Sequence, residues 1–321
     1  MSRLKDYLET CKQQYYKGDP IISDNQFDAL EELCAEDLDV GTNRGRVKHW
    51  FRMYSLQKIY TDESMPHNLR EYQETPKLDG ASLSIRYING TIDTVVTRGD
   101  GHYGEDVTHL FSPNVLEKVG IPWELSIDVM RVEGIVQITG EICAKSDIRN
   151  ARNYAAGALN LKNSHDFKSK EVEFFAYDMQ GQPPKILYLS TLIYLEQLCF
   201  NTVRSRKVIE YPQDGTVYRI IHNDAYEKLG FTNKHPRGAF ALKERSKGVK
   251  TILLRVDWKT GKSGKVTPVA ILDAVDIDGA VVSKATLNNP GFIESLDLHI
   301  GDAVMVERAG GIIPRIIKKA E

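Results

Sequence analysis

Residues 77–101 have the sequence KLDGASLSIRYINGTIDTVVTRGDG, and this stretch predicts the centre of the fold. Apolar and polar side chains alternate over residues 82–88 and again over residues 91–97, which is the pattern of half-buried β-strands. An Asn-Gly pair at residues 89–90 separates the two runs and favours a two-residue turn, because both residue types tolerate positive φ angles. The stretch therefore predicts a β-hairpin, with Lys77 just before its first strand.

The rest of the chain predicts a mixed α+β protein of several domains. Its 321 residues are enough for two or three domains. Apolar spacing predicts helices near 3–17, 24–38, 63–74, 146–160 and 189–201, and strands near 135–143, 171–178 and 217–222. After residue 247, short apolar runs separated by glycine-rich or charged turns predict a small β-barrel of about 70 residues. We therefore expect a domain boundary near residue 247.

Composition and cysteine spacing exclude several classes of protein. Hydrophobic residues make up 41% of the chain and charged residues 27%, as in soluble globular proteins, and no run of about 18 apolar residues predicts a transmembrane helix. The N-terminus lacks the apolar stretch of a secretory signal, so we expect a cytoplasmic protein without a membrane partner. None of the four cysteines belongs to a Cys-x-x-Cys pair, which argues against a zinc ribbon.

The charge distribution contains one feature that suits nucleic acid. The net charge is −2, so the whole chain does not indicate nucleic-acid binding. Residues 247–265, however, carry six basic side chains against the single acid Asp257. A local basic stretch can face phosphates while the rest of the protein stays neutral, although an ordinary solvated surface explains the same charges.

Several short motifs follow one another in order along the chain. They are Lys77-Leu78-Asp79-Gly80, Arg98-Gly99-Asp100-Gly101, Gly140-Glu141, Ala151-Arg152-Asn153-Tyr154-Ala155-Ala156-Gly157, Phe174-Phe175-Ala176-Tyr177, Asp214-Gly215 and Ala241-Leu242-Lys243. Each motif alone is weak, but the ordered series resembles the adenylylation domain of NAD-dependent DNA ligases. That domain belongs to the covalent nucleotidyltransferases, so the resemblance implies ATP-grasp-like antiparallel sheets with helices over residues 61–247.

Both ends of the chain carry further resemblances to the same family. The C-terminal region is similar to its OB-fold through Thr267-Pro268-Val269-Ala270, Ala285-Thr286-Leu287-Asn288-Asn289, Ile300-Gly301-Asp302, Arg308-Ala309-Gly310 and Ile313-Pro314. The N-terminal region is similar to a helical module that binds nicotinamide mononucleotide, through Tyr15-Tyr16, Asp24 and Phe27-Asp28. The resemblance implies a helical module over 1–60 and an OB-fold over 248–321, which ends just inside the expected end of the barrel.

The resemblance implies a three-step ligation with NAD and Mg²⁺. Lys77 attacks the α-phosphate of NAD, expels nicotinamide mononucleotide and forms lysyl-AMP. The AMP then moves to the 5′-phosphate of a nick in double-stranded DNA, and the 3′-hydroxyl displaces it. A lysine can act as such a nucleophile when burial and neighbouring cations depress its pKa, while positioning and charge stabilisation dominate phosphoryl transfer.

The same resemblance implies a role for each candidate residue. Lys77, Asp79, Arg98, Asp214 and Lys243 are the catalytic candidates. The cofactor-binding candidates also include Tyr15, Tyr16, Asp24, Phe27, Asp28, Glu74, Thr75, Glu141, Tyr177 and Arg219. Within these sets, Arg98, Lys243 and Arg219 would bind phosphate oxygens. Glu141 would bind the ribose, and Tyr177 would contact the adenine. Asp214 would activate Lys77. Arg152 and Lys262 would contact nucleic acid, and Mg²⁺ would bind through Asp214 or Glu141.

Simpler structural roles stay open for some of these residues. Tyr177 is also suited to a core strand, Glu141 to a structural ion pair, and Tyr15 and Tyr16 to packing between helices.

The chain departs from the family pattern at several positions. A glutamate that contacts adenine is usual at position 75, where this chain has Thr75 with Glu74 beside it, so either residue is a candidate. Arg219 stands where a lysine is usual, and Lys262 where an arginine is usual. Phe27 replaces a tyrosine and keeps only its ring.

Full-length family members continue into a zinc finger, helix-hairpin-helix repeats and a BRCT domain. We therefore expect a second ligase subunit to supply such DNA-binding elements, in a bacterial or phage-infected cell. Two rival functions are an ATP- or GTP-dependent nucleotidyltransferase (an ATP-dependent DNA ligase, RNA ligase or capping enzyme) and a catalytically dead binding subunit.

The N-terminal motif distinguishes NAD from a triphosphate substrate. We expect Asp28→Ala to abolish reaction with NAD, because Asp28 is assigned to the nicotinamide mononucleotide that leaves. The same variant should still ligate when supplied already adenylylated. A nick-sealing assay measures both activities, and loss of both would contradict the assigned role.

Overall fold

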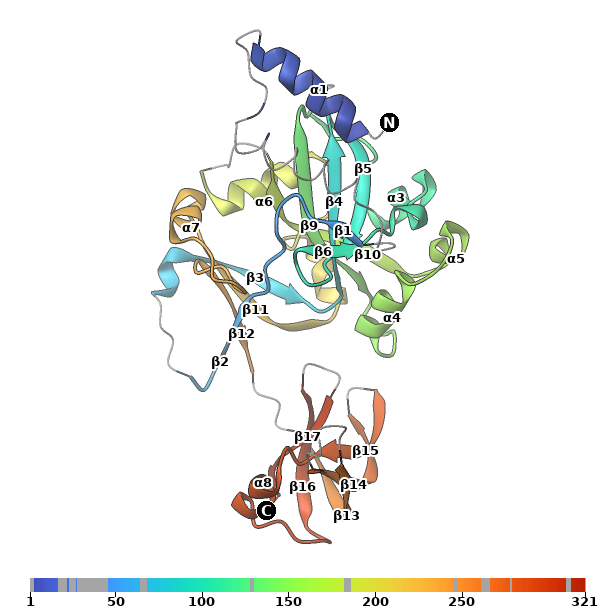
Figure 1. Ribbon diagram of the computed structural model, residues 1–321, viewed down its shortest axis with the longest axis vertical. Helices are drawn as coiled ribbons and strands as arrows, with labels where there is room; N and C mark the ends of the chain where they lie inside the picture. The colour runs from blue at the N-terminus through green and yellow to red at the C-terminus, as the bar shows by residue number, and fades with distance from the viewer. Residues whose placement is uncertain are drawn as a thin grey trace. The chain divides into compact units, whose positions relative to one another are not determined.

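The computed structural model divides into two compact units, Met1–Lys243 and Glu244–Glu321, and each is described by itself (Figure 1). The structure describes residues 3–16, 22, 27, 46–63, 68–127, 130–181, 186–244, 248–260, 266–277, 279–309 and 313–320.

The predicted hairpin lies in a four-stranded antiparallel sheet of the first unit. The strand order is β10-β9-β4-β5, with β4 (Ala81–Ile88), β5 (Thr91–Thr97), β9 (Ile135–Ala144) and β10 (Val172–Gln180). Ile88 pairs with Thr91 across the turn, where Asn89 and Gly90 adopt φ angles of 49° and 73°. The hairpin prediction is therefore confirmed, and the turn has the backbone that an Asn-Gly pair favours.

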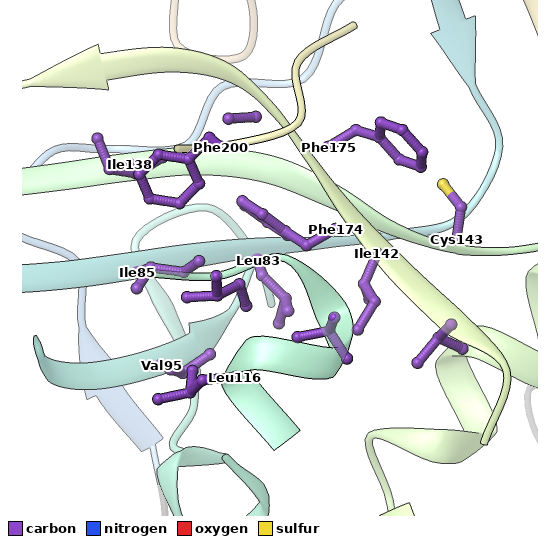
Figure 2. Packing of buried hydrophobic residues seen from close by; sticks show 14 of the residues in the cluster. Leu83, Ile85, Val95, Leu116, Ile138, Ile142, Cys143, Phe174, Phe175 and Phe200 are labelled. Carbon is purple, nitrogen blue, oxygen red and sulfur yellow. The ribbon is translucent and has the colours of Figure 1, made fainter. Parts of the chain in front are cut away.

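The main hydrophobic core packs on this sheet. Leu83, Ile85, Ile138 and Phe174 are fully buried, and Figure 2 shows their side chains gathered between strands and helices. Burial of each such side chain contributes about 1.5–3 kcal/mol to the free energy of folding. Helices α3 (Pro113–Val119), α4 (Ala151–Ala158) and α6 (Tyr188–Gln197) contact strands of the sheet. The core thus fixes β4 and β9, the strands that flank the candidate site.

A second four-stranded sheet carries Lys77. Its order is β2-β12-β11-β3, with β2 (Gln57–Tyr60), β3 (Tyr72–Leu78), β11 (Gln213–Ile220) and β12 (Ala239–Lys243). Only two residues separate the end of β3 from the start of β4, so Lys77 lies where the chain passes from one sheet to the other.

The predicted helix near residues 63–74 is wrong. Leu69–Glu71 forms a single 3-10 turn, and β3 begins at Tyr72, while residues 64–67 lie outside the described part of the chain. Pairing with β11 satisfies the backbone of β3, and Pro76 lacks the N–H group that a continuing helix requires. Long-range pairing therefore overrides the local helical pattern.

The remaining elements of the first unit are shorter. The other helices are α1 (Arg3–Tyr16), α5 (Ser164–Lys168) and α7 (Asn223–Leu229), with 3-10 turns at Thr108–Leu110 and Arg206–Glu210. Two small sheets pair β1 (Arg46–Lys48) with β6 (Tyr103–Glu105), and β7 (Ser126–Ile127) with β8 (Met130–Arg131). Helix α4 begins later than predicted because Asn150 adopts a left-handed φ of 54°.

The N-terminal helical module stays a prediction. Helix α1 packs Tyr7, Leu8 and Cys11 into a small cluster with Trp50 and Ile88. The second predicted helix, over 24–38, lies almost entirely outside the described residues.

The second unit is a closed five-stranded barrel, which confirms the predicted OB-fold architecture. The barrel order is β13-β14-β15-β17-β16, with bounds Val249–Thr260, Val266–Ile277, Ala280–Thr286, Ile313–Lys319 and Ala303–Ala309 in that order. Its core includes Leu253, Leu272 and Val304, and helix α8 (Pro290–Ser295) is capped by the side chain of Asn289. Across both units, no described helix is long and apolar enough to cross a membrane.

Candidate active site

Two lysines share one carboxylate at the centre of the candidate site. Lys77 Nζ lies 2.8 Å from Asp214 Oδ1, and Lys243 Nζ contacts Oδ2 of the same carboxylate. The residues come from the adjacent strands β3, β11 and β12. Their side chains are between 17% and 25% exposed, so the cluster is shielded from bulk water yet accessible to a ligand.

A β-bulge in β11 turns Asp214 toward Lys77. The pairing of β11 with β3 shifts between Gln213 and Thr216, so that Asp214 and Gly215 together lie opposite Lys77. Gly215 has a φ of 151°, and a Cβ atom there would lie 2.3 Å from the carbonyl oxygen of the neighbouring strand. Glycine therefore permits the close strand contact that supports the bulge.

The electrostatic balance keeps Asp214 ionised. Burial by itself raises the pKa of this carboxyl, but the positive charges and hydrogen bonds of Lys77 and Lys243 outweigh burial and hold the pKa below its ordinary value. A carboxylate paired with two ammonium groups leaves one net positive charge on the cluster, which suits an anionic ligand.

The turn after Lys77 is fixed on both sides. Asp79 N donates to Pro212 O at 2.9 Å, and Arg152 Nη1 donates to Asp79 Oδ1 at 3.0 Å. A Cβ atom on Gly80 would lie 2.3 Å from Ile142 O, so the turn requires glycine. Burial raises the pKa of Asp79, although the charge of Arg152 acts against this. The predicted nucleic-acid residue Arg152 thus pairs with the loop of the predicted nucleophile.

Glu141 lies beside this turn on β9. Ser82 Oγ donates to Glu141 Oε2 at 2.7 Å, across paired positions of β4 and β9. Burial raises the pKa of Glu141, while the hydrogen bond from Ser82 and the charges of Lys77 and Arg98 act in the opposite direction. The structure therefore brings Glu141 and two of the predicted cations into one electrostatic environment.

Arg98 is anchored through its backbone. Arg98 N donates to Ser82 O at 3.0 Å, and His49 Nε2 lies 3.2 Å from Arg98 O. The turn that follows contains Gly99 and Gly101, with φ angles of 55° and 93°. Strand β4 and a distant histidine thus determine where the Arg98 side chain begins.

Sequence reasoning missed His49. Its side chain is 4% exposed, and Nδ1 lies 3.0 Å from Ser84 Oγ. A carbonyl oxygen can only accept, so Nε2 carries the proton and Nδ1 accepts from Ser84. Burial, aided by the charge of Arg86, lowers the pKa of His49 to about 4, which agrees with this neutral form. The only signal in the sequence was a histidine next to two aromatic residues.

The two candidates for the adenine contact lie on opposite faces of β3. Thr75 is 6% exposed and shares a strand face with Lys77, because side chains alternate along a strand. Glu74 is exposed on the other face, where it hydrogen-bonds Tyr218. Only Thr75 therefore points to the side of the sheet that carries the nucleophile.

Tyr177 occupies a bulge of β10. The pairing with β9 shifts between Ala176 and Asp178, so Tyr177 is the extra residue. Its side chain is half-buried and packs partly against the main core. Burial raises the pKa of Tyr177, and the charge of Glu141 adds to this effect.

Arg219 lies on the face of the second sheet that carries Lys77 and Thr75, but farther from Lys77. It pairs with Gln73, four residues before Lys77, a separation of roughly 13 Å at the usual rise of a strand. The side chain is buried, lies 3.7 Å from Asp178 Oδ1, and contacts the rings of Tyr188 and Tyr226. The structure does not bring Arg219 into the ion-pair cluster around Asp214.

Most of the predicted nicotinamide-binding side chains, and the barrel residue Lys262, lie outside the described part of the chain. Asp24, Asp28 and Lys262 are not described, and Tyr15 and Tyr16 are described only as the backbone at the end of α1. Phe27 is half-buried against the α1 cluster, with Lys12 Nζ 5.6 Å from its ring centre. In the part of the chain that is described, no three His, Cys, Asp or Glu side chains gather to hold a metal ion.

The burial of His49 predicts a pH dependence of stability. Its pKa is about 4 in the fold against 6.5 ordinarily, so its stabilising effect is complete above pH 6.5 and is lost as the pH falls toward 4. Linkage gives a loss of about 2 kcal/mol in the free energy of unfolding between about pH 7.5 and about pH 5. His49→Gln should lack this part of the loss in urea unfolding. Equal losses in both proteins would contradict the assignment.

Comparison with known proteins assigns the chain to a family. The family model for the NAD-dependent DNA ligase adenylation domain matches residues 42–202, and that for the NAD-dependent DNA ligase OB-fold domain matches residues 250–321. A DNA ligase of Rhodopseudomonas palustris is 32% identical over 99% of this chain and 48% of its own length. DNA ligase 1 of Nocardia farcinica is 31% identical over 97% of this chain and 54% of its own length. The chain spans about half the length of these relatives, and it belongs to the NAD-dependent DNA ligase family.

Proposed function

We propose that this chain is the nucleotidyl-transfer core of a DNA ligase that uses NAD. Lys77 accepts AMP from NAD, the AMP passes to the 5′-phosphate of a DNA nick, and the 3′-hydroxyl then closes the nick. The observation that carries the proposal is the carboxylate of Asp214 shared by Lys77 and Lys243, in a chain of this family.

The first step requires the amine of Lys77 to lose a proton and to approach phosphorus in line. Nζ of Lys77 forms a P–N bond as the P–O bond to nicotinamide mononucleotide breaks, and the nucleotide leaves with the bonding electrons. Asp214 orients the amine through its 2.8 Å contact and offers an acceptor for the proton. Lys243 and Arg98 bind the phosphate oxygens and offset their charge.

The remaining pocket residues are proposed to bind the rest of NAD. Glu141, beside Ser82, binds the ribose hydroxyls, and Tyr177 packs on the adenine ring. Thr75 is preferred to Glu74 at the base because it shares the strand face of Lys77. Arg219 contacts the end of the dinucleotide remote from Lys77 rather than the reacting phosphate, given its distance along β11. The N-terminal residues Tyr15, Tyr16, Asp24, Phe27 and Asp28 bind nicotinamide mononucleotide.

The carboxylates near Lys77 suit a Mg²⁺ ion that has few protein ligands. Asp214 and Glu141 are the proposed ligands, and Asp79 is a further carboxylate that interacts with both of them. Mg²⁺ commonly binds one or two carboxylates together with water and substrate phosphates. When bound, the ion would offset negative charge on the transferring phosphoryl group.

The domain arrangement is proposed as a nicotinamide module over 1–60, an adenylylation domain over 61–247 and an OB-fold over 248–321. Two observations support it. The chain divides into compact units after Lys243, and the family models match residues 42–202 and 250–321. Arg152 and Lys262 are proposed to contact nicked DNA in the cytoplasm of a bacterial or phage-infected cell. Further DNA-binding elements would come from a second subunit or another segment of the chain, since the relatives are about twice as long as the matched region.

Label transfer tests the first step. With Mg²⁺ and NAD labelled in the adenylate phosphate, the protein should become labelled on a denaturing gel, and Lys77→Ala should not. Lys243→Ala should label roughly 10²–10³-fold more slowly, because it removes one charge at the phosphate and leaves the nucleophile. Labelling from ATP and not from NAD would support a triphosphate-dependent enzyme, and labelling from neither would withdraw the proposal.

Nick sealing tests the later steps and the need for further elements. We expect the 321-residue chain to adenylylate itself faster than it seals a nicked duplex, because few phosphate contacts give weak binding at physiological salt. The two rates are compared in single-turnover experiments. Sealing as fast as self-adenylylation would show that additional DNA-binding elements are unnecessary.

A further inference from the structure

The side chain of Arg219 is enclosed by residues from three other elements. Its Cζ atom lies 4.1 Å from the ring centre of Tyr188 and 4.2 Å from that of Tyr226, at α6 and α7. These two tyrosines are called the aromatic clamp. Asp178 on β10 lies 3.7 Å away, and the Tyr226 side chain also hydrogen-bonds the guanidinium. Arg219 itself is only 9% exposed.

Two donor nitrogens of this guanidinium lack a hydrogen-bond partner in the described part of the chain. Among the described residues, Nε and Nη1 of Arg219 are buried and have no hydrogen-bond partner. Buried donors in folded proteins are almost always satisfied, so an exception needs an explanation. A bound ligand that presents acceptor atoms would satisfy both donors.

The clamp connects to the proposed nucleotide pocket by hydrogen bonds. The Tyr188 hydroxyl donates to Tyr177 O at 2.9 Å and is hydrogen-bonded by the side chain of Thr75. Thr75 shares its strand face with Lys77, and Arg219 lies on the same face of the sheet. Arg219 therefore lies on the same face of the sheet as the nucleophile, and its two unpaired donors are buried behind the proposed nucleotide site.

A second layer of rings supports the clamp. The Tyr226 ring meets Phe231 edge-on at 5.8 Å, and Phe231 stacks on Tyr54 at 4.4 Å with an angle of 15°. Arg52 in turn lies over the Tyr54 ring at 4.6 Å. These ring contacts pack against Tyr226 and so support the guanidinium that it contacts.

We propose that Tyr188 and Tyr226 are positioning residues that aim Nε and Nη1 of Arg219 at acceptor atoms of the bound dinucleotide, remote from Lys77. The clamp sets the affinity for NAD and not the rate of P–N bond formation, because it does not reach the reacting phosphate. A guanidinium suits this arrangement better than an ammonium group, since its flat face stacks on aromatic rings. The inference rests on the proposed function, which supplies the ligand.

The test is the dependence of the self-adenylylation rate on NAD concentration. Tyr226→Leu and Arg219→Lys should each raise KM for NAD about tenfold, which lies between the effects of an exposed and a desolvated cation–π contact, with the rate at saturation within about twofold of wild type. The double variant should be no worse than the worse single variant, because both changes remove the same interaction. Tyr226→Phe keeps the ring and should restore most of the affinity.

Tyr194→Leu is the matched control. Tyr194 lies on α6, is half-buried and packs against the main core, so the same substitution perturbs a neighbouring site without removing a clamp ring. Equal KM values for Tyr226→Leu and Tyr194→Leu, or additive effects in the double variant, would overturn the clamp. If Tyr226→Leu does not fold, Arg219→Lys against wild type decides alone. Wild-type protein that takes no label from NAD would instead refute the proposed function.

Discussion

One carboxylate between two lysines is the interaction on which the candidate site depends. Asp214 holds Lys77 from β3 and Lys243 from β12, so a single side chain joins three strands. The partly shielded position strengthens these ion pairs relative to exposed ones, and the two lysines keep the carboxylate ionised despite its burial. The two amines would repel each other without it, and the cluster retains one positive charge for a phosphate.

Backbone geometry makes this arrangement possible. The bulge at Asp214 and Gly215 lets two residues oppose Lys77, and the Asp79-Gly80 turn carries the chain from one sheet to the other. Both turns need glycine because a Cβ atom would collide with a neighbouring carbonyl oxygen. The core of the first sheet is tightly packed (Figure 2). This sheet holds Glu141 and Ser82 beside the same turn. Charge, bulge and close packing thus act together at one point of the fold.

Local patterns in the sequence predicted the hairpin and the C-terminal barrel, but they did not predict features that depend on pairing between distant segments of the first unit. The hairpin around residues 89–90 follows from alternating side chains and an Asn-Gly pair, and the structure has it as predicted. The prediction of a helix near 63–74 was wrong because β3, which begins in that segment, is stabilised by pairing with β11. The choice between Glu74 and Thr75 needed the strand register. The environment of His49 depends on Ser84 and Arg98, both more than thirty residues away, and no local signal reports it.

Because two lysines share the carboxylate of Asp214, the most direct test is to determine which of the two amines receives AMP. Peptide mapping by mass spectrometry, after incubation of the wild-type protein with NAD and Mg²⁺, locates the adenylate directly. We expect a single modified residue, Lys77, because it shares its strand face with Thr75 and precedes the turn against Glu141. An adenylate on Lys243 would mean that the roles of the two lysines are reversed. An adenylate outside this cluster would contradict the assignment of the active site.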